Sequence, residues 1–318
     1  MIVRIGERRI GDGAPPFLLA EAGVNHNGSP EMARRLVEAA ADAGADGVKF
    51  QTFSAEALAT AAAPLAEYQR RQSSSGSQLE MLRALELPRE ALRSARDRAV
   101  ELGITFLSTP FDLQSVQLLA ELDVPAYTVG SGDLTNLILL HCTSAYPAAA
   151  ADANLRAMAT LRERFGVPVG YSDHTLGLTT AIAAAALGAA VIEKHLTLDR
   201  SLPGPDHAAS LEPAEMTELA AALHDAYAAL GDGRKEPRRG EADTTLVARR
   251  SLVAARALKA GAPIAADDVD ARRPAGGISP MRLDEVVGRR AARDLDSGAL
   301  LHVKDFDPPL DPVAKPRG

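Results

Sequence analysis

Two histidines end consecutive apolar runs and are the sharpest candidates for chemistry in the sequence. His174 closes the run that begins at Val169, and His195 closes the run that begins at Val191. If both runs are parallel strands joined by one helix, their ends lie close together and two imidazoles can bind one ion. A site of two histidines without thiolates suits Mn²⁺, Mg²⁺ or Fe²⁺, with positions left open for water and substrate. The alternative is two histidines that are hydrogen-bonded separately.

Charged side chains end two earlier runs. Lys49 and Gln51 share one face of the strand predicted at 47–52, because side chains alternate along a strand. A lysine directed into the mouth of a barrel is costly unless it meets an anion, which favours a clamp for phosphate or carboxylate. A lysine that reaches solvent at the strand end is the alternative. Glu21 is either a general acid or base, or a carboxylate bonded to turn amides.

Hydroxyl groups and stiff turns follow other runs. Thr109, Ser131 and Ser144 lie in short polar motifs whose hydroxyls and amides suit phosphate oxygens. In the stretch 203–207, Pro-Gly-Pro-Asp-His, two prolines stiffen the loop that carries Asp206. Such a loop either presents the carboxylate to sugar hydroxyls or is only a rigid turn.

A repeating pattern must position these groups: a short apolar run, a polar cluster, then an amphipathic helical segment. Seven such βα-type units occupy roughly 230 residues, which predicts a parallel sheet flanked by helices. In every unit the polar cluster stands at the carboxyl end of the apolar run. Parallel α/β folds, and βα barrels in particular, place their chemistry there.

The composition changes after Gly231 to Gly, Arg, Lys, Glu and Pro, which is typical of a linker. Beyond it, residues 254–262 resemble residues 291–299, and each copy runs on to an aspartate, Asp268 or Asp305. This repeat predicts a compact β-rich module. The predicted boundaries are a barrel domain at 1–235, a linker at 236–248, the β-rich module at 249–306 and a disordered tail at 307–318.

Composition narrows the class of protein. The chain has 318 residues, 46% hydrophobic and 24% charged, with 35 basic against 42 acidic residues and a formal charge of −7. Without a basic block, a nucleic-acid partner is not expected. The single cysteine, Cys142, excludes an intrachain disulfide. The first residues lack the apolar region of a signal peptide, and the most apolar stretch, 179–191, is too short for a bilayer. We expect a cytoplasmic enzyme without a membrane partner.

Taken together, these clusters resemble the N-acetylneuraminate (sialic acid) synthase family. The matching motifs are AEAGVNHNG, VKFQTF, AEYQ, SQLEM, FLSTPFD, GSGDLTN, LHCTSAYP, VGYSDHTLG, VIEKHLTLDR, PGPDHAASLEP and RRPAGGISP. They follow the family order over nearly the whole chain. The resemblance implies an α/β fold, a (β/α)8-type (TIM) barrel, followed by a small antifreeze-like (SAF, β-clip) domain.

The family condenses phosphoenolpyruvate with an N-acetylhexosamine and water, releasing phosphate and forming a nine-carbon 2-keto acid. The resemblance therefore implies a synthase that makes N-acetylneuraminate from N-acetylmannosamine. The same reaction on a 2,4-diacetamido-trideoxyhexose, giving legionaminic or pseudaminic acid, is the alternative. A divalent-metal aldolase that cleaves an existing keto acid is a third reading.

The resemblance also assigns roles by position. His174 and His195 would bind a divalent metal, Mn²⁺ first, with Mg²⁺ or Co²⁺ as alternatives. Glu21, Lys49 and Asp206 are the implied catalytic residues. The implied substrate-binding residues are Gln51, Thr109, Ser131, Ser144, Tyr146, Ser172 and Arg273. The family is a homodimer in which each small domain caps the other barrel, so Arg273 would reach the acetamido group of a sugar in the partner subunit.

Two departures from the family pattern bear on activity. About forty residues, one barrel strand among them, are missing between Asp133 and the strand at 138–144, and the short connection left cannot form a parallel crossover. The sequence thus predicts a barrel that lacks one βα unit, with either the 138–144 strand inverted or one run outside the barrel. Thr128 stands where the family has a lysine that helps to bind phosphoenolpyruvate. A catalytically impaired paralogue therefore stays open.

Overall fold

The computed structural model describes residues 2–72, 75–127 and 137–311, and the chain divides between Asp232 and Gly233 into two compact units. The first unit is built on one sheet of six parallel strands in the order β5-β4-β3-β8-β7-β6. Their bounds are β3 Phe17–Gly23, β4 Gly47–Thr52, β5 Thr105–Pro110, β6 Leu139–Cys142, β7 Val169–Asp173 and β8 Val191–His195.

The first and last of these strands pair with each other, which is the closure expected of a βα barrel rather than of an open doubly wound sheet. Leu19 and Glu21 of β3 lie opposite Glu193 and His195 of β8. The predicted α/β barrel fold is confirmed. Among the described residues, β5 and β6 end the strand order, at the place where the sequence lacks one unit.

The strand β6 pairs in parallel with β7, from Leu139 opposite Val169 to Cys142 opposite Ser172. The hypothesis that this strand is inverted is therefore wrong. The connection from β6 to β7 contains the helix α7, Ala157–Phe165, which is long enough to return the chain for a parallel pairing. The direction of β6 is thus set by the connection that follows it. The other predicted run, 126–133, lies mostly outside the described residues.

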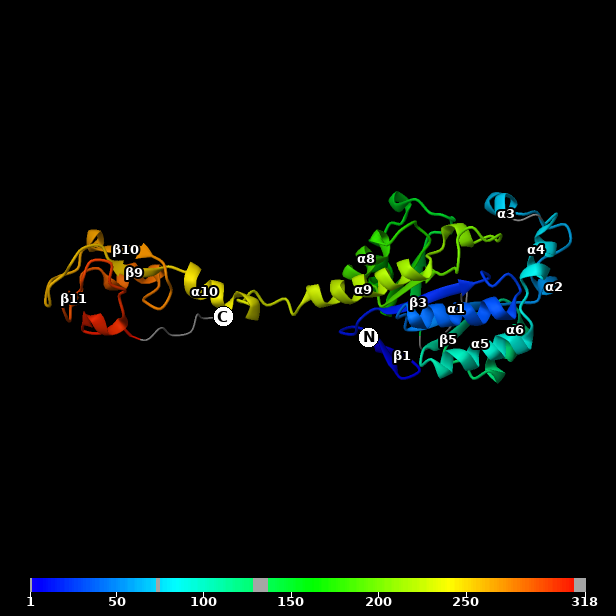
Figure 1. The fold of residues 1–318 in the computed structure, drawn as a ribbon, viewed down its shortest axis with the longest axis horizontal. Coiled ribbons are helices and arrows are strands. Elements are labelled where there is room, and N and C mark those ends of the chain that lie inside the picture. Colours follow the sequence, from blue (N-terminus) through cyan, green and yellow to red (C-terminus); the bar gives the residue numbers. More distant parts are fainter. Residues whose placement is uncertain (1, 73–74, 128–136, 312–318) are drawn as a thin grey trace. The chain divides into compact units, whose positions relative to one another are not determined.

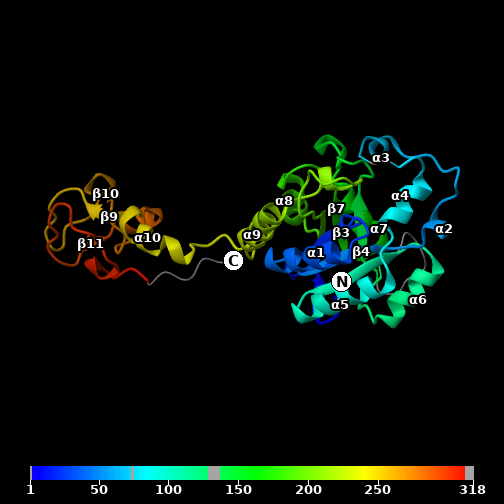
Figure 2. The ribbon, with the colours of Figure 1, turned by 45° about the vertical axis from the view of Figure 1, so that its right-hand side comes forward.

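Helices cover the outer face of the sheet, with α1 packed on α5 and α8 packed on α9 (Figures 1 and 2). Ser29 caps α1 and Pro30 occupies its first turn, where a missing N–H costs nothing. The bounds of the covering helices are α1 Pro30–Asp42, α5 Arg89–Glu101, α6 Leu113–Glu121, α7 Ala157–Phe165, α8 Thr179–Ala186 and α9 Pro213–Leu230. Three short helices follow β4, namely α2 Ala55–Leu58, α3 Glu67–Gln72 and α4 Gln78–Leu85.

The inward-facing side chains change from apolar to charged between the amino and the carboxyl ends of the strands. At the amino ends Phe17, Leu19, Leu107 and Val191 form an apolar cluster, which a hairpin of β1 (Ile2–Ile5) and β2 (Arg8–Gly11) joins through its buried isoleucines. Because alternate residues share a face, the next inward positions on β3 and β8 are Glu21 and Glu193. The carboxyl ends of the strands thus carry charge above an apolar floor.

The second unit contains α10 Ala242–Ala248, β9 Ser251–Ala254, β10 Val269–Arg272, α11 Leu283–Val286, β11 Arg290–Ala291 and β12 Phe306–Asp307. The internal repeat is visible as matched contacts. Arg256 pairs with Asp268 at 2.6 Å and Arg293 pairs with Asp305 at 2.8 Å, and an antiparallel bridge between Leu258 and Leu295 joins the two copies.

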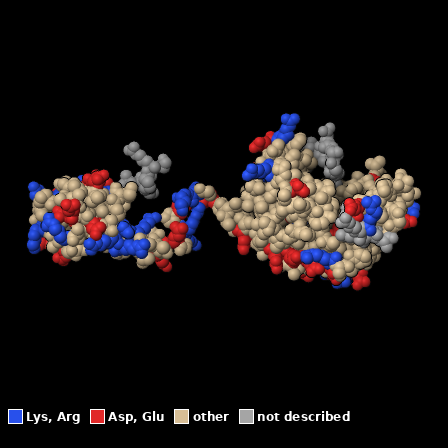
Figure 3. Space-filling view, turned by 90° about the horizontal axis from the view of Figure 1, so that it is seen from above, with Lys and Arg blue, Asp and Glu red and all other residues tan. Residues whose placement is uncertain are grey.

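The second unit extends past its predicted end at residue 306. Asp307 belongs to β12, and the buried Leu310 packs into the core of this unit. The predicted tail therefore begins too early. The predicted linker at 236–248 contains the exposed helix α10. The segment that opens this unit contains Arg234, Lys235, Arg238 and Arg239, and Lys and Arg side chains are visible on it beside acidic ones (Figure 3). No helix among the described residues is long and apolar enough to cross a membrane.

Gly170 lets the strands beside β7 approach closely. A Cβ atom at this position would lie 2.6 Å from the Val191 carbonyl oxygen and 2.7 Å from Leu140 Cδ2. We expect Gly170→Ala to lower the free energy of unfolding by about 1–3 kcal/mol, measured by urea denaturation, since the backbone of β8 cannot move away cheaply. Gly240→Ala is the control, because its Cβ atom would meet nothing within 4 Å. Equal stability of Gly170→Ala and the wild type would contradict this packing.

Candidate active site

The carboxyl ends of β3, β4, β7 and β8 bring charged side chains together around one amine. Lys49 Nζ lies 2.9 Å from Glu21 Oε2 and 2.6 Å from Glu193 Oε2. Ser172 Oγ donates a hydrogen bond to Glu193 Oε1 at 2.7 Å. All four side chains are buried. Lys49 therefore meets anions, as a buried lysine must, but the anions are carboxylates of the protein.

The two carboxylates differ in their protonation. Burial raises the pKa of Glu21 to about 8 against the attraction of Lys49, and the charge of Glu193 adds to the rise. Burial also acts to raise the pKa of Glu193, but Lys49 and the hydrogen bond from Ser172 outweigh it and hold the pKa below its ordinary value. At neutral pH, Glu21 is accordingly protonated and Glu193 ionised. The pKa of Lys49 is raised because the two carboxylates outweigh its burial.

The two candidate metal ligands lie beside this cluster. The ring centroids of His174 and His195 are 5.4 Å apart. The Thr143 carbonyl can only accept, so His174 Nδ1, at 2.8 Å, carries the proton and donates. The Nε2 lone pair of His174 then accepts from the Tyr146 hydroxyl at 3.1 Å. A carbonyl that fixes the tautomer in this way is typical of histidines that bind metals.

Both imidazoles are neutral, as metal ligation requires. Burial lowers the pKa of His174, and it lowers that of His195 to about 3 with a further contribution from His174. His195 Nδ1 is buried and has no hydrogen-bond partner among the described residues. The described chain offers no cluster of three His, Cys, Asp or Glu side chains for a metal. The residues present fit a divalent ion held by two imidazoles, with its other positions open.

Gly23 is where three of these groups converge. A Cβ atom there would lie 3.2 Å from Glu21 Oε1, 3.6 Å from Gln51 Nε2 and 3.7 Å from His195 Cε1. Its φ of +52° also favours glycine. The Oε1 atom of Glu21 has no hydrogen-bond partner in the described part of the chain. The acid oxygen, the amide and the imidazole thus face one small space.

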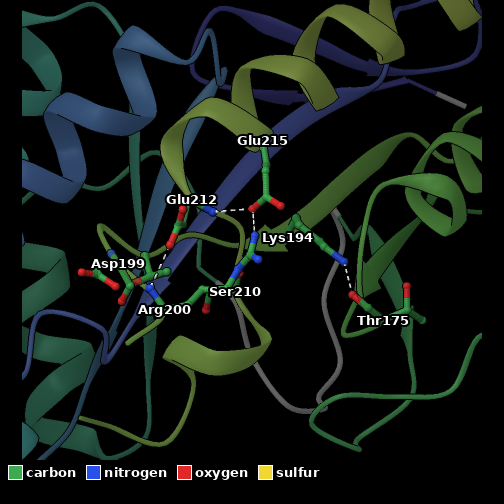
Figure 4. A network of polar contacts seen from close by, with 8 residues as sticks. Thr175, Lys194, Asp199, Arg200, Ser210, Glu212 and Glu215 are labelled. Atoms are coloured by element: carbon green, nitrogen blue, oxygen red, sulfur yellow. Dashed lines mark hydrogen bonds and ion pairs between the residues drawn. The ribbon is translucent and has the colours of Figure 1, made fainter. Parts of the chain in front are cut away.

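Asp206 lies on the loop that follows β8, and Arg200 ties this loop to the start of α9 (Figure 4). The Arg200 backbone N–H donates to Glu212 Oε1 at 3.1 Å and its Nε to the Ser210 carbonyl at 3.0 Å, and its Nη2 pairs with Glu215. Burial raises the pKa of Asp206 to about 6. Its charge also raises the pKa of Glu21, which places the two carboxyl groups in one electrostatic environment.

The remaining predicted residues differ in position. Thr109 is half-buried on β5 opposite Gln51, and Ser144 is exposed on the loop that carries Tyr146. Ser131 and Thr128 lie outside the described residues. Arg273 is exposed in the second unit. Each of these residues therefore keeps its assignment only as a prediction.

Sequence reasoning missed Glu193. Its signal is alternation: Glu193 shares a strand face with His195, so a strand that directs one into the site directs the other there too. A glutamate inside an apolar run, on the site face of its strand, also needs a cation, and Lys49 is that cation.

The lysine between two carboxylates generates a stability prediction. Lys49→Met leaves both carboxyl groups buried without their cation, and we expect a loss of about 3–5 kcal/mol in the free energy of unfolding at pH 7. The pKa of each carboxyl then lies above its unfolded value, so the folded variant holds protons that the unfolded chain releases. The loss should therefore grow as pH rises and shrink toward pH 5, where the unfolded chain begins to hold these protons as well. Urea denaturation at several pH values measures this.

A matched control is Lys259→Met, which removes an exposed lysine paired with Asp294 and should leave stability nearly unchanged. Adding Glu193→Gln to Lys49→Met should recover part of the loss. A loss that is independent of pH would contradict the proposed charge balance.

Comparisons with known proteins identify the family of this chain. The model of the NeuB family matches residues 36–140 and 135–235, and that of the SAF domain matches residues 249–307. The chain is 42% identical over 330 residues to the N,N'-diacetyllegionaminic acid synthase of Legionella pneumophila, covering 90% of this chain and 93% of that protein. It is 34% identical over 269 residues to human N-acetylneuraminate-9-phosphate synthase, covering 72% and 75%. The crystal structure of an N-acetylneuraminic acid synthetase from Leptospira borgpetersenii, in complex with citrate, matches with a TM-score of 0.66 and 30% identity, covering 77% and 95%.

The alignments also bear on the short connection. The match to the Legionella protein spans 330 positions but only 90% of a 318-residue chain, so about forty positions of the alignment have no counterpart here. The family model matches in two stretches that meet at 135–140. Both findings agree with a missing βα unit at that point. These matches agree with the polar strand ends and with the repeat in the second unit. The chain belongs to the NeuB family, and it is a nonulosonic acid synthase with a C-terminal SAF domain.

Proposed function

We propose that the enzyme condenses phosphoenolpyruvate with a 2,4-diacetamido-trideoxyhexose and water to give a legionaminic-type acid and phosphate. The observation that carries the reaction class is the strand-end site, where a protonated Glu21 and a charge-balanced Lys49–Glu193 pair lie beside two neutral imidazoles. The names of the relatives support the choice of sugar.

The motifs that resemble the sialic acid synthase family favour N-acetylmannosamine as the sugar substrate. The synthases from Legionella pneumophila and Campylobacter jejuni that are 42% and 39% identical to this chain are both named N,N'-diacetyllegionaminic acid synthases. The human N-acetylneuraminate-9-phosphate synthase is 34% identical. Greater identity over a larger share of the chain favours the diacetamido sugar.

The protonation state of Glu21 sets the net charge that phosphoenolpyruvate meets in the cluster of Glu21, Lys49 and Glu193. With Glu21 protonated, Lys49 and Glu193 carry opposite charges and the three groups together are neutral. If Glu21 ionised, the cluster would carry one negative charge and repel an anionic substrate. The raised pKa of Glu21 thus serves both to admit the anion and to supply a proton.

The two proton transfers of the reaction have different candidates. When the enol carbon attacks the sugar aldehyde, the aldehyde oxygen takes a proton, and protonated Glu21 is the acid. When water attacks the resulting oxocarbenium carbon, a base must accept a proton. Asp206, whose pKa is about 6, is ionised at neutral pH and is assigned this role. Gln51 and Tyr146 are assigned to orient the sugar.

His174 and His195 would bind the divalent metal, for which Mn²⁺ is proposed. When bound, the metal would polarise the aldehyde oxygen as a Lewis acid. The Thr143 carbonyl keeps the His174 proton on Nδ1, so that Nε2 carries a lone pair. This lone pair accepts from the Tyr146 hydroxyl in the structure and would exchange that bond for the metal. Arg273 of the partner subunit is proposed to reach the acetamido group in a homodimer.

One observation favours a second function. About forty positions of the alignment have no counterpart in this chain, and β5 and β6 end the strand order of the described residues. A catalytically impaired paralogue that still binds substrate or product is therefore the other candidate.

Phosphate release separates these candidates. The full chain, incubated with phosphoenolpyruvate and Mn²⁺, should release phosphate faster with the 2,4-diacetamido sugar than with N-acetylmannosamine, and mass spectrometry should show the nine-carbon keto acid. Release only with N-acetylmannosamine would overturn the choice of sugar. No release from folded, Mn²⁺-loaded protein would support the impaired paralogue, and binding of pyruvate but not phosphoenolpyruvate would support an aldolase.

The pKa values predict the pH dependence of this reaction. The rate should rise as Asp206 loses its proton near pH 6 and fall as Glu21 loses its proton near pH 8. Glu21→Gln removes the acid and should lower the rate by about 10²–10⁴-fold, with the alkaline limb abolished in the residual activity. Steady-state phosphate assays between pH 5 and 9.5 measure both effects. An alkaline limb that persists in Glu21→Gln would assign that limb to another group.

A further inference from the structure

A second ion pair lies on the opposite face of the strands that carry the two histidines. Lys194 Nζ is 2.8 Å from Asp173 Oδ2, and both side chains are fully buried. Register explains the placement: Ser172 is opposite Glu193 and Asp173 is opposite Lys194, so the first pair faces the site and the second faces the helices. The helix-facing side of such a sheet is otherwise apolar, and two charges there cost free energy of desolvation.

This pair holds the backbone next to His174. Asp173 Oδ1 accepts from the Thr175 N–H at 2.9 Å, and Lys194 Nζ also donates to the Thr175 carbonyl (Figure 4). The Ala148 N–H donates to the His174 carbonyl at 2.9 Å. The peptide groups on the carboxyl side of His174 are therefore fixed by named partners.

We propose that Asp173 and Lys194 form a positioning pair, which fixes the backbone at His174 so that its ring lies beside His195 and its Nδ1–H points to the Thr143 carbonyl. The pair faces the helices, on the side of the strands away from the candidate site. Its role as an aid to metal binding rests on the proposed function, whereas its effect on the His174 ring does not.

The free energy of a buried ion pair supports a role for Asp173 and Lys194 in positioning the backbone rather than in stability. A buried ion pair is often no more stabilising than apolar residues of similar volume, so stability alone does not account for charges at these two positions. Without Lys194, the Thr175 carbonyl loses a buried donor and Asp173 loses its cation. The chain after His174 would then turn to reach other donors, and the 2.8 Å bond between His174 and Thr143 would be lost.

The test uses the full chain with Lys194→Met and with the double variant Asp173→Leu/Lys194→Met, in which no buried charge is left unpaired. The control is Ile192→Val, a buried residue on the same face of β8. In metal-free protein, ¹⁵N NMR of the imidazoles reports the tautomer of His174. In Mn²⁺ titrations, electron paramagnetic resonance reports the dissociation constant.

We expect both variants to lose the single Nδ1–H tautomer of His174 and to bind Mn²⁺ about 10–100-fold more weakly. The double variant should recover the thermal stability that Lys194→Met loses, while its tautomer and metal affinity stay altered. Ile192→Val should lower stability only. A double variant with the wild-type tautomer would overturn the proposal. If the wild type binds no Mn²⁺ and releases no phosphate, the proposed function fails, and the tautomer measurement still decides this inference.

Discussion

The rest of the site depends on one lysine amine bonded to two buried carboxylates. Lys49 holds Glu193 ionised while Glu21, more weakly opposed by the same cation, keeps its proton. This division gives the cluster of these three buried residues an acid, an anion and a cation with no net charge among them. An anionic substrate can approach such a cluster without repulsion, and a proton donor is already in position.

The sheet supplies this cluster by pairing its first parallel strand, β3, with its last, β8. Pairing of β3 with β8 sets Glu21 beside His195, and pairing of β3 with β4 sets Glu21 beside Lys49. Alternation along β7 and β8 then separates two layers of charge. Ser172 and Glu193 face the site, while Asp173 and Lys194 face the helices. Among the described residues, β5 and β6 end the strand order, on the far side from this pairing.

Much of this arrangement follows from the sequence, because polar clusters at the ends of apolar runs must meet in a parallel barrel. That argument correctly brought His174, His195, Lys49 and Glu21 to one rim. Pairing across the sheet does not follow in the same way. The sequence favours a clamp for a substrate anion at Lys49, which stays a prediction. Alternation gives the face on which Glu193 lies, but it does not show that this residue, 144 positions away, lies against the Lys49 amine. The direction of β6 was also open, since it depends on the connection that follows rather than on the shortened one.

The most direct test of the charge balance around Lys49 is the protonation state of Glu21 in the free enzyme. Infrared difference spectra of the wild type and Glu21→Gln, recorded across the pH range, isolate the carboxyl band of this one residue. We expect a protonated carboxyl at pH 7 that ionises with a pKa of about 8. A carboxylate band from Glu21 already present at pH 5.5 would contradict it.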